Sequence, residues 1–242
     1  TLFPAHDDNI LTYLNDDGLM VEPVYYAPII PMILVNGSKG IGTGFSTDIM
    51  CYNPLQIIDY IKNKLLNIED EIDFVPYYEG FKGTVSKIAD QKYLIKGVYQ
   101  KIGDDKVRIT ELPVGTWTMS YTSYLESLVD GVTDKNGKKS SPLLRDFTSI
   151  STEVNVDFTV VFPRGKLAEL ENELDANNCN GVEKLLKLFT TVSTTNMHMF
   201  NAECKLQKYS SPEEIIDDFY GVRIGLYQKR KAYLISEMEQ KL

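Results

Sequence analysis

The chain has 242 residues, of which 43% are hydrophobic and 24% are charged, and its formal net charge is −9. These are ordinary values for a globular protein of one or two domains, and no apolar run reaches the ~18 residues that a membrane span needs. The acidic balance argues against a free-standing DNA-binding module, because affinity for a duplex comes largely from Lys and Arg side chains that neutralise phosphates. If the chain touches DNA, it must do so through a local patch.

The cysteines and histidines argue against several kinds of site. Three cysteines lie far apart without a CxxC pair, which predicts reduced thiols in an intracellular protein. The two histidines, His6 and His198, are too few to favour a histidine zinc site or a Ser-His-Asp triad. Met197 and Met199 flank His198, a pattern that predicts a packed strand rather than a metal site.

Residues 1–27 are interpreted as a solvated connector. A short helix is predicted over residues 9–14, and the sequence Asp16-Asp17-Gly18 predicts a turn. Acidic residues surround both features, so we expect this segment to face solvent.

Residues 28–47, with the sequence PIIPMILVNGSKGIGTGFST, are the most distinctive part of the chain. The apolar run at residues 29–35 is rich in β-branched residues and contains a proline, which predicts an extended or edge segment rather than a helix interior. Asn36-Gly37 predicts a turn. A glycine-rich loop follows, in which Ile41 and Thr43 alternate with Gly40, Gly42 and Gly44.

Ile41 is a bulky apolar side chain in a loop that offers little core to bury it. Glycines beside it let the backbone approach another surface closely, and an apolar side chain on such a loop can act as a wedge between stacked bases. Two other interpretations stay open. The stretch can be an ordinary turn, or a nucleotide-phosphate loop, although its glycine spacing differs from GxGxxG and no GK[ST] follows.

The next elements alternate between helix and strand. Asn53 and Pro54 open a helix predicted over residues 53–66. Runs rich in Val, Ile, Thr and Tyr then predict strands over residues 83–88, 93–99 and 106–112. Their alternation is typical of an antiparallel sheet with one buried face.

The second half of the chain continues in the same way. A helix is predicted over residues 118–129, with Trp117 as a packing anchor beneath it. The loop at 130–142 carries Lys135, Lys138 and Lys139, which are expected at a solvated tip or against phosphate. Further predicted elements are a strand over 156–162, short helices over 167–174 and 182–189, and a β segment over 190–200.

The last predicted element is a long helix. Ser211 is its expected cap, Pro212 its first residue, and Glu214 closes a capping box. An apolar stripe then continues to the last residue, so a helix of about 30 residues without a C-cap predicts a coiled-coil arm. The run Lys229-Arg230-Lys231 is expected on its solvated face.

The run EPVYYAPIIPMILVNGSKGIGTGFSTDIMCYNP closely resembles the breakage-reunion region of type IIA DNA topoisomerases, and in particular the eukaryotic topoisomerase II pattern. Gyrase-type proteins differ after the same Asn-Gly turn. Further matches follow in order at Glu111-Leu112-Pro113, Thr116-Trp117-Thr118 and Tyr227-Gln228-Lys229-Arg230-Lys231. The resemblance covers essentially the whole chain.

The resemblance implies an α+β fold with a mixed or antiparallel sheet and packed helices, followed by a long coiled-coil helix. Residues 1–27 then correspond to the end of a winged-helix region, residues 28–205 to the tower or shoulder domain, and residues 206–242 to the start of the arm toward the exit gate. The family's nucleophilic tyrosine would lie shortly before Thr1, so no catalytic residue and no metal ligand is assigned here.

The implied function is that of an ATP-dependent topoisomerase II, which breaks one duplex transiently and passes another through the break. This segment would bend and support the gate DNA. Mg²⁺ and ATP would act elsewhere in the full enzyme, with none bound by this segment. Expected partners are double-stranded DNA and a second copy of the enzyme, and no membrane. The enzyme would be nuclear if cellular, or act at a cytoplasmic replication site if viral.

The resemblance assigns Ile41 as the wedge that enters the base stack. Lys39 replaces a usual acidic residue of the family and is expected to add a phosphate contact, and Gly40, Gly42 and Thr43 complete the DNA-binding set. Two alternatives stay open: a structural or dimerising module without DNA contact, which the negative charge favours, and a nucleotide-binding domain, which the glycine spacing opposes.

Overall fold

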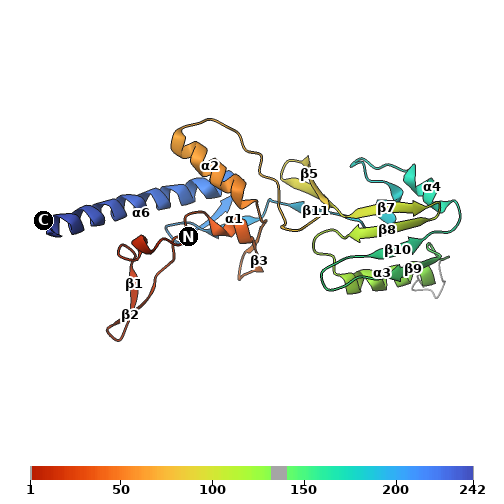
Figure 1. Ribbon diagram of the computed structural model, residues 1–242, viewed down its shortest axis with the longest axis horizontal. Helices are drawn as coiled ribbons and strands as arrows, with labels where there is room; N and C mark the ends of the chain where they lie inside the picture. The colour runs from red at the N-terminus through yellow and green to blue at the C-terminus, as the bar shows by residue number, and fades with distance from the viewer. Residues whose placement is uncertain (1, 132–140, 242) are drawn as a thin grey trace. The chain divides into compact units, whose positions relative to one another are not determined.

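The computed structural model describes residues 2–131 and 141–241 (Figure 1). Backbone contacts divide the chain into two compact units, one made of residues 1–78 with 194–242, the other of residues 79–193. These borders differ from those expected at 27/28 and 205/206, and the assignment of functional domains stays a prediction. Lys135, Lys138 and Lys139 lie outside the described residues.

In the second unit, the described residues form two antiparallel sheets. Its four-stranded sheet has the order β7-β8-β10-β9 and its three-stranded sheet the order β11-β6-β5. The strands are β5 (Thr84–Ala89), β6 (Lys92–Lys96), β7 (Val98–Gly103), β8 (Lys106–Glu111), β9 (Asp146–Ser149), β10 (Phe158–Val161) and β11 (Phe189–Ser193). The expected strand over residues 93–99 is therefore two strands, which separate at Gly97 and belong to different sheets.

The core of this unit joins the inward faces of β8 and β10 to three helices. These are α3 (Thr118–Asp130), α4 (Lys166–Glu171) and α5 (Gly181–Leu185). Val107 and Phe158 are fully buried, and the Tyr121 ring packs edge-on against Phe158 at a centroid distance of 5.2 Å. The Tyr121 hydroxyl donates to the Leu186 carbonyl at 2.7 Å, which satisfies the one polar group that this ring carries into the core.

Trp117 is not the packing anchor that the sequence suggested. Its side chain is 77% exposed, and the residue occupies the N-cap position of α3. The anchoring role belongs to Tyr121, Leu125 and Leu128, which lie about one, two and three turns further along and are buried. The prediction failed because the N-cap residue precedes the buried stripe of a helix and need not share its face.

Among the described residues, the first unit holds three two-stranded sheets and the longest helix. Its elements are η1 (Ala5–Asp7), β1 (Tyr13–Asp16), β2 (Leu19–Pro23), α1 (Met32–Asn36), β3 (Ser38–Ile41), β4 (Ser46–Ile49), α2 (Pro54–Leu66), β12 (Met197–Phe200), β13 (Leu206–Tyr209) and α6 (Pro212–Lys241). The Asn53 side chain caps α2 as predicted, accepting from the Leu55 amide at 2.9 Å.

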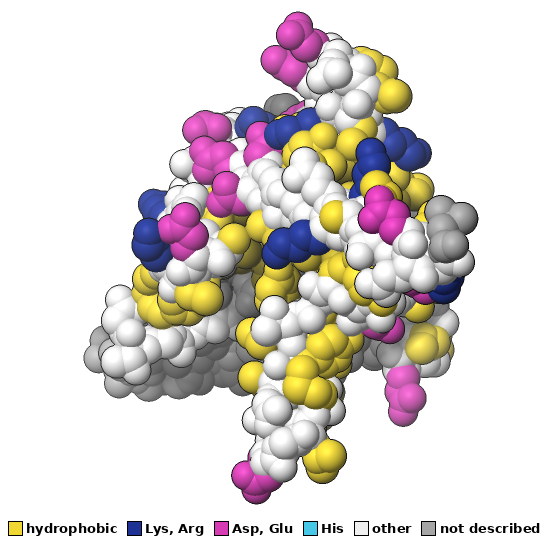
Figure 2. All heavy atoms as spheres, turned by 90° about the vertical axis from the view of Figure 1, so that its left-hand side faces the viewer, with side chains coloured by type: hydrophobic (Ala, Val, Ile, Leu, Met, Phe, Trp, Pro, Cys, Tyr) yellow, Lys and Arg dark blue, Asp and Glu magenta, His cyan; other side chains and the backbone are white. Residues whose placement is uncertain are grey.

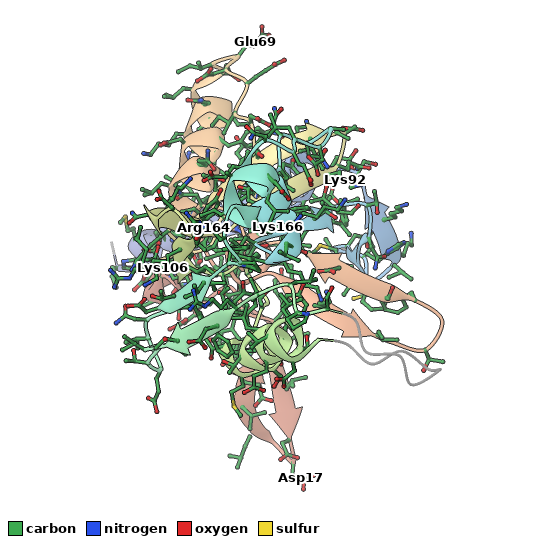
Figure 3. All side chains as sticks on the ribbon, turned by 90° about the vertical axis from the view of Figure 1, so that its right-hand side faces the viewer. Asp17, Glu69, Lys92, Lys106, Arg164 and Lys166 are labelled. Atoms are coloured by element: carbon green, nitrogen blue, oxygen red, sulfur yellow. The ribbon has the colours of Figure 1, made fainter. Side chains whose placement is uncertain are left out.

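The helix expected over residues 9–14 is absent, and β1 pairs with β2 there instead. Asp17 and Gly18 have φ angles of 48° and 91°, so the predicted Asp-Asp-Gly turn is confirmed as the tip of this hairpin (Figure 3). Such positive angles in sequence reverse the chain tightly. The turn decided the local structure, because it brings residues 13–16 back against residues 19–23 and leaves no room for a helix.

The extended segment expected over residues 29–35 is also wrong. Residues 32–36 form α1, whose N-cap is Pro31 and whose C-cap is Gly37. Leu34 is fully buried in the core of this unit beside Ile57 and Ile216. Tertiary burial thus outweighed the β-branched character of the run, as happens for short elements whose intrinsic preference is weak.

The predicted long helix is confirmed as α6, with 30 residues. The Glu214 amide donates to the Ser211 hydroxyl at 3.4 Å, and the Glu214 carboxylate accepts from the Ser210 amide at 2.8 Å. Among its described residues, none beyond Leu226 is buried. The distal half of α6 therefore carries exposed apolar side chains, including Tyr233 and Met238, and whether it forms a coiled coil stays a prediction.

No helix within the described residues is both long and apolar enough to cross a membrane. On the face shown in Figure 2, Lys and Arg side chains are scattered among Asp and Glu side chains rather than gathered into one broad patch. On this face, charge alone therefore does not mark out a DNA interface. The α+β class with antiparallel sheets, packed helices and a long final helix is confirmed.

Candidate nucleic-acid interface

The glycine-rich stretch is a β-hairpin. Strands β3 and β4 pair antiparallel, and the last pair of the ladder is Ile41 with Ser46. The Gly42 amide donates to the Phe45 carbonyl at 2.8 Å, which closes the loop beyond that pair. Gly44 has a φ of 91°, a conformation that favours glycine. Strand β3 thus ends at Ile41, and the glycine-rich loop that follows forms the tip of the hairpin.

Ile41 projects into solvent with 93% of its surface exposed, the highest value among the exposed large apolar side chains of the described residues. Its neighbours Gly40 and Gly42 are exposed too, and a Cβ added to Gly40 would meet nothing within 4 Å. Exposing a large aliphatic side chain forgoes about 1.5–3 kcal/mol of burial. The tip therefore presents an apolar side chain between two stretches of bare backbone.

Lys39 lies two rungs below Ile41 on the same side of β3, because side chains two residues apart share a face of a strand. Its Nζ is 2.9 Å from Oδ2 of Asp48, which is its partner in the ladder, while the side chain remains 81% exposed. An exposed pair of this kind contributes little, so Asp48 is a weak competitor for the ammonium. Thr43 lies exposed in the loop.

The base of the hairpin is held by a close backbone contact. Gly37 has a φ of 66°, and a Cβ there would lie 2.7 Å from the Ile49 carbonyl oxygen and 3.0 Å from Sγ of Cys51. The Tyr52 amide donates to the Leu34 carbonyl at 2.7 Å. The chain that leaves β4 is thereby tied to α1, and the hairpin emerges from a fixed base.

A second hairpin, formed by β12 and β13, packs beside β4. The Asp48 amide donates to the Asn196 carbonyl at 2.8 Å, and the Asn196 side-chain amide donates to Oγ of Ser46 at 3.0 Å. The Phe45 and Phe200 rings meet edge to face at 6.2 Å. Sequence reasoning missed these residues, because about 150 positions separate the two hairpins and no local pattern links them.

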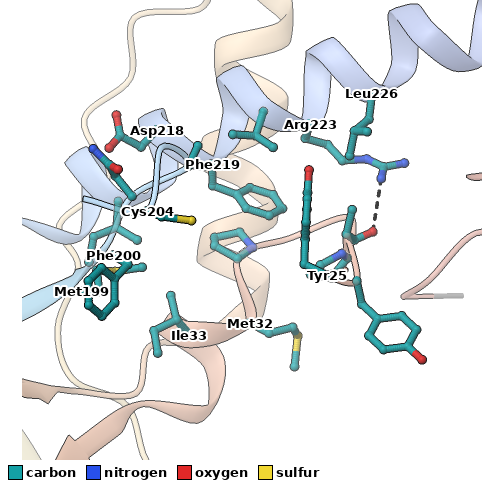
Figure 4. Close-up of a pocket in the computed structure, with 18 of the residues that line it drawn as sticks. Tyr25, Met32, Ile33, Met199, Phe200, Cys204, Asp218, Phe219, Arg223 and Leu226 are labelled. Atoms are coloured by element: carbon teal, nitrogen blue, oxygen red, sulfur yellow. Dashed lines mark hydrogen bonds between the residues drawn. The ribbon is translucent and has the colours of Figure 1, made fainter. Parts of the chain in front are cut away.

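A cavity of about 530 Å³ borders α1. It is lined mainly by apolar side chains from residues 24–33, the β12–β13 region and the first half of α6 (Figure 4). Arg223 borders it from α6, is 4% exposed, and donates through Nη1 to the Ala27 carbonyl at 3.2 Å, the dashed line in Figure 4. This contact ties the segment that precedes α1 to α6.

The same arginine pairs with a buried carboxylate. Nη1 of Arg223 lies 2.6 Å from Oδ2 of Asp7, and Nη1 of Arg230 donates to Oδ1 at 3.1 Å. The first contact is an ion pair without hydrogen-bond alignment, since Oδ2 has no hydrogen-bond donor among the described residues. Both guanidinium groups stack on Tyr227, at 4.1 and 4.8 Å from the ring centroid.

Two expectations hold only in part: most of residues 2–26 and both Lys229 and Lys231 are exposed as expected, but this cluster contains two exceptions. Asp7, in the presumed solvated connector, is 2% exposed, and Arg230, on the presumed solvated face of α6, pairs with it. The residues that meet are more than 200 positions apart, so charge runs in the sequence could not reveal the pairing. The segment at residues 1–27 is therefore anchored to α6 at this point.

No catalytic constellation is visible among the described residues. They contain no group of three or more His, Cys, Asp or Glu side chains placed to hold a metal ion. Burial, reinforced by Asp217, raises the pKa of Tyr60 to about 12, and burial also raises the pKa of Tyr121 and of Tyr209. A raised pKa disfavours the phenolate form of these tyrosines.

Comparisons with known proteins match the whole chain. A family model that describes the A subunit of DNA gyrase/topoisomerase IV matches residues 1–242. The chain is 40% identical over 242 residues to DNA topoisomerase 2 of Pisum sativum and 42% identical over 245 residues to that of Arabidopsis thaliana, covering all of this chain and 16% of each relative. It thus spans about one-sixth of these relatives' length.

A solved structure supports the same relationship. The chain superposes on the DNA-binding, cleavage and re-ligation domain of Plasmodium falciparum topoisomerase II with a TM-score of 0.85 and 41% identity. The match covers 99% of this chain and 31% of that one. At this identity and coverage the likeness extends beyond general architecture to the order of elements along the chain.

Proposed function

The chain belongs to the family of DNA gyrase/topoisomerase IV A subunits, and from that membership we propose that it is the segment of a type IIA topoisomerase that bends and supports the DNA to be cleaved. The observation that carries the proposal is the 93% exposed Ile41 at the tip of a hairpin with a fixed base. No other large apolar side chain of the described residues has so high an exposed fraction.

Ile41 acts as a wedge that enters between two stacked base pairs. Partial unstacking costs a few kcal/mol per step, and the cost is offset because a bent duplex wraps over more protein surface. Gly40 and Gly42 leave no side chain beside the wedge, so the bases on either side approach the backbone of the tip. Thr43 offers a hydroxyl to the DNA from the loop.

The chemistry of strand cleavage belongs to other parts of the enzyme. The chain has a net charge of −9, so most of the phosphate grip on the duplex comes from outside it. The complete enzyme is a homodimer that breaks one duplex, passes a second through the break and uses ATP and Mg²⁺ outside this segment. It acts in the nucleus if the source is cellular, or at a cytoplasmic replication site if viral.

Substituting Ile41 with alanine in the full-length protein is expected to abolish DNA bending while leaving binding largely intact. Alanine is too short to separate stacked bases, whereas the phosphate contacts that dominate affinity are unchanged. Fluorescence energy transfer across an end-labelled duplex measures the bend, and anisotropy measures the affinity in the same samples.

Ile102→Ala is the matched control, since Ile102 is 51% exposed near the turn of the β7–β8 hairpin in the other unit. Bending should be unchanged in this variant. If Ile41→Ala bends DNA as well as the unsubstituted protein does, the wedge has no role and the proposal fails.

Lys39→Gln is expected to weaken DNA binding and to reduce the slope of log K against log salt by about 0.9, the contribution of one phosphate contact. The reason is that its side chain is 81% exposed and its ion pair with Asp48 contributes little. Titrations at several salt concentrations give the slope. Lys62→Gln removes an exposed lysine that is likewise paired, with Asp59 at 3.2 Å, and should leave the slope unchanged.

A structural or dimerising role without DNA contact is the competing function, and the net charge of −9 favours it. It differs from the main proposal in one measurable way. A purely structural segment would leave the salt slope and the bend angle of the full-length protein unchanged in both the Ile41 and the Lys39 variants.

A further inference from the structure

We propose that Asn196 is a positioning residue for the Ile41 wedge, acting through its side-chain hydrogen bond to Ser46. The inference rests on the proposed function, because a residue can position a wedge only where a wedge operates. It assigns a role in DNA bending to the β12–β13 hairpin, which lies about 150 residues away in sequence from the hairpin that carries Ile41.

The wedge needs external support because its hairpin is small. Strands β3 and β4 have four residues each and, within the part of the chain that the structure describes, pair with no third strand. An isolated two-stranded hairpin is marginally stable in water, and unstacking bases costs a few kcal/mol per step. Without further contacts, the hairpin would bend or unpair at its tip before the bases came apart.

The support reaches the hairpin at the rung that bears the wedge. Ser46 is the ladder partner of Ile41, and its Oγ accepts the Asn196 side-chain amide at 3.0 Å. Two rungs further down, the Asp48 amide donates to the Asn196 carbonyl at 2.8 Å. Asn196 therefore holds β4 at two points, one through its backbone and one through its side chain.

The direction of the Asn196 amide is set by a third contact. Its Oδ1 lies 2.9 Å from Nδ1 of His198, which serves as the donor because a carbonyl oxygen only accepts. This leaves the NH₂ group to face Ser46. The Phe45–Phe200 ring contact links the same two hairpins. His198, which the sequence placed in a packed strand, thus has a role in orienting Asn196.

The apolar wedge and the support that holds it therefore depend on different residues. Ile41 supplies the surface that enters the stack, and Asn196 sets the direction and stiffness of the hairpin that carries it. Loss of the Asn196 side chain leaves its backbone bond to Asp48 in place, so the hairpins stay adjacent while the rung at Ile41 is released. We expect DNA to bind but to be unstacked less often.

The test uses the full-length protein with a duplex carrying 2-aminopurine at the bend centre, whose fluorescence rises when its base is unstacked. Asn196→Ala and Ser46→Ala are each expected to shift the equilibrium toward stacked, unbent DNA by roughly fivefold, the value of one hydrogen bond. The double variant should show the same shift as either single one, because both remove one interaction. Ser46→Thr keeps the hydroxyl and should restore the signal.

Gln207→Ala is the control for general loosening of the β12–β13 hairpin. Gln207 accepts from the Asn201 side chain at 3.1 Å within that hairpin. This variant should leave the 2-aminopurine signal unchanged. If it lowers the signal as much as Asn196→Ala does, or if the Asn196 and Ser46 effects add, the positioning role is overturned.

Measuring Ile41→Ala in the same assay distinguishes the role of the wedge from the role of Asn196. Loss of unstacking in Ile41→Ala with none in Asn196→Ala rejects the positioning residue and leaves the wedge standing. Full unstacking in Ile41→Ala rejects the wedge, and the role of Asn196 with it. Loss in both, with rescue by Ser46→Thr, supports the inference.

Discussion

Replacing Asp7 with alanine is expected to destabilise the first unit by about 3–5 kcal/mol, the usual cost of removing one partner from a buried ion pair. Asp7 is 2% exposed and Arg223 is 4% exposed, so solvent cannot take over the role of the lost carboxylate. The Arg223 guanidinium would keep only the Ala27 carbonyl at 3.2 Å and the face of Tyr227 as partners among the described residues.

Hydrogen exchange read peptide by peptide measures this effect, because it reports each unit separately. Protection should fall in residues 1–78 and 194–241 and stay unchanged in the described parts of 79–193. Asp8→Ala is the matched control, since it removes the same charge from the adjacent exposed position and should change stability by less than about 0.5 kcal/mol.

A double substitution tests whether charge or packing holds this contact. Apolar residues of similar volume often replace a buried ion pair at little cost. Asp7→Leu with Arg223→Met should therefore recover much of the protection that Asp7→Ala loses. A stability loss for Asp7→Ala no larger than that for Asp8→Ala would mean that the buried pair contributes nothing measurable.

Replacing Gly97 with alanine is expected to destabilise the second unit by about 3 kcal/mol or more, at the upper end of overpacking effects. An added Cβ would lie 2.3 Å from the Glu111 carbonyl oxygen and 3.1 Å from its carbonyl carbon. Both are backbone atoms of β8, whose position is held by pairing to β7 and β10. The amide of Gly97 also donates to the Leu188 carbonyl at 2.8 Å, so the residue cannot easily move away.

Gly103→Ala provides the comparison at the far end of the adjoining strand, β7. A Cβ there would approach its nearest neighbour, the Cβ of Lys106, to 3.6 Å, which is ordinary contact. This variant should be neutral or slightly stabilising, because alanine restricts the unfolded chain. Urea unfolding followed by hydrogen exchange in the described parts of residues 79–193 distinguishes the two. Equal stability of the two variants would show that β7 and β8 relax around the clash.

Local chemistry was enough to predict several elements correctly. The helix capped by Asn53 and the helix that follows Ser211 both begin at the predicted residues. A capping side chain and a proline at the first position each act on a single helical turn, so their effect can be predicted locally. The Asp-Asp-Gly turn likewise forms at Asp17 and Gly18. The antiparallel class of the sheets also follows from alternation, which a strand with one buried face must show.

Elements that depend on distant partners could not be predicted in the same way. Residues 32–36 become α1 because Leu34 is buried in a core built partly from residues after 196. Strand β9 and strand β13 lack a strong pattern of their own and exist because β10 and β12 pair with them. The break at Gly97 is set by how closely β8 approaches, which no local sequence feature states.

The sequence by itself determined the family, the long final helix and the unusual place of Ile41 among glycines, because each of these can be recognised from residues that are adjacent in the chain. Only the tertiary structure decided how Ile41 is held. The ladder pairing with Ser46, the hydrogen bond from Asn196 to Ser46 and the burial of Asp7 between Arg223 and Arg230 all depend on the folded backbone. The second of these joins positions 150 residues apart, and the third joins positions more than 200 residues apart. Hydrogen bonds and ion pairs act over a few ångströms in space, so these contacts exist only once the chain has folded.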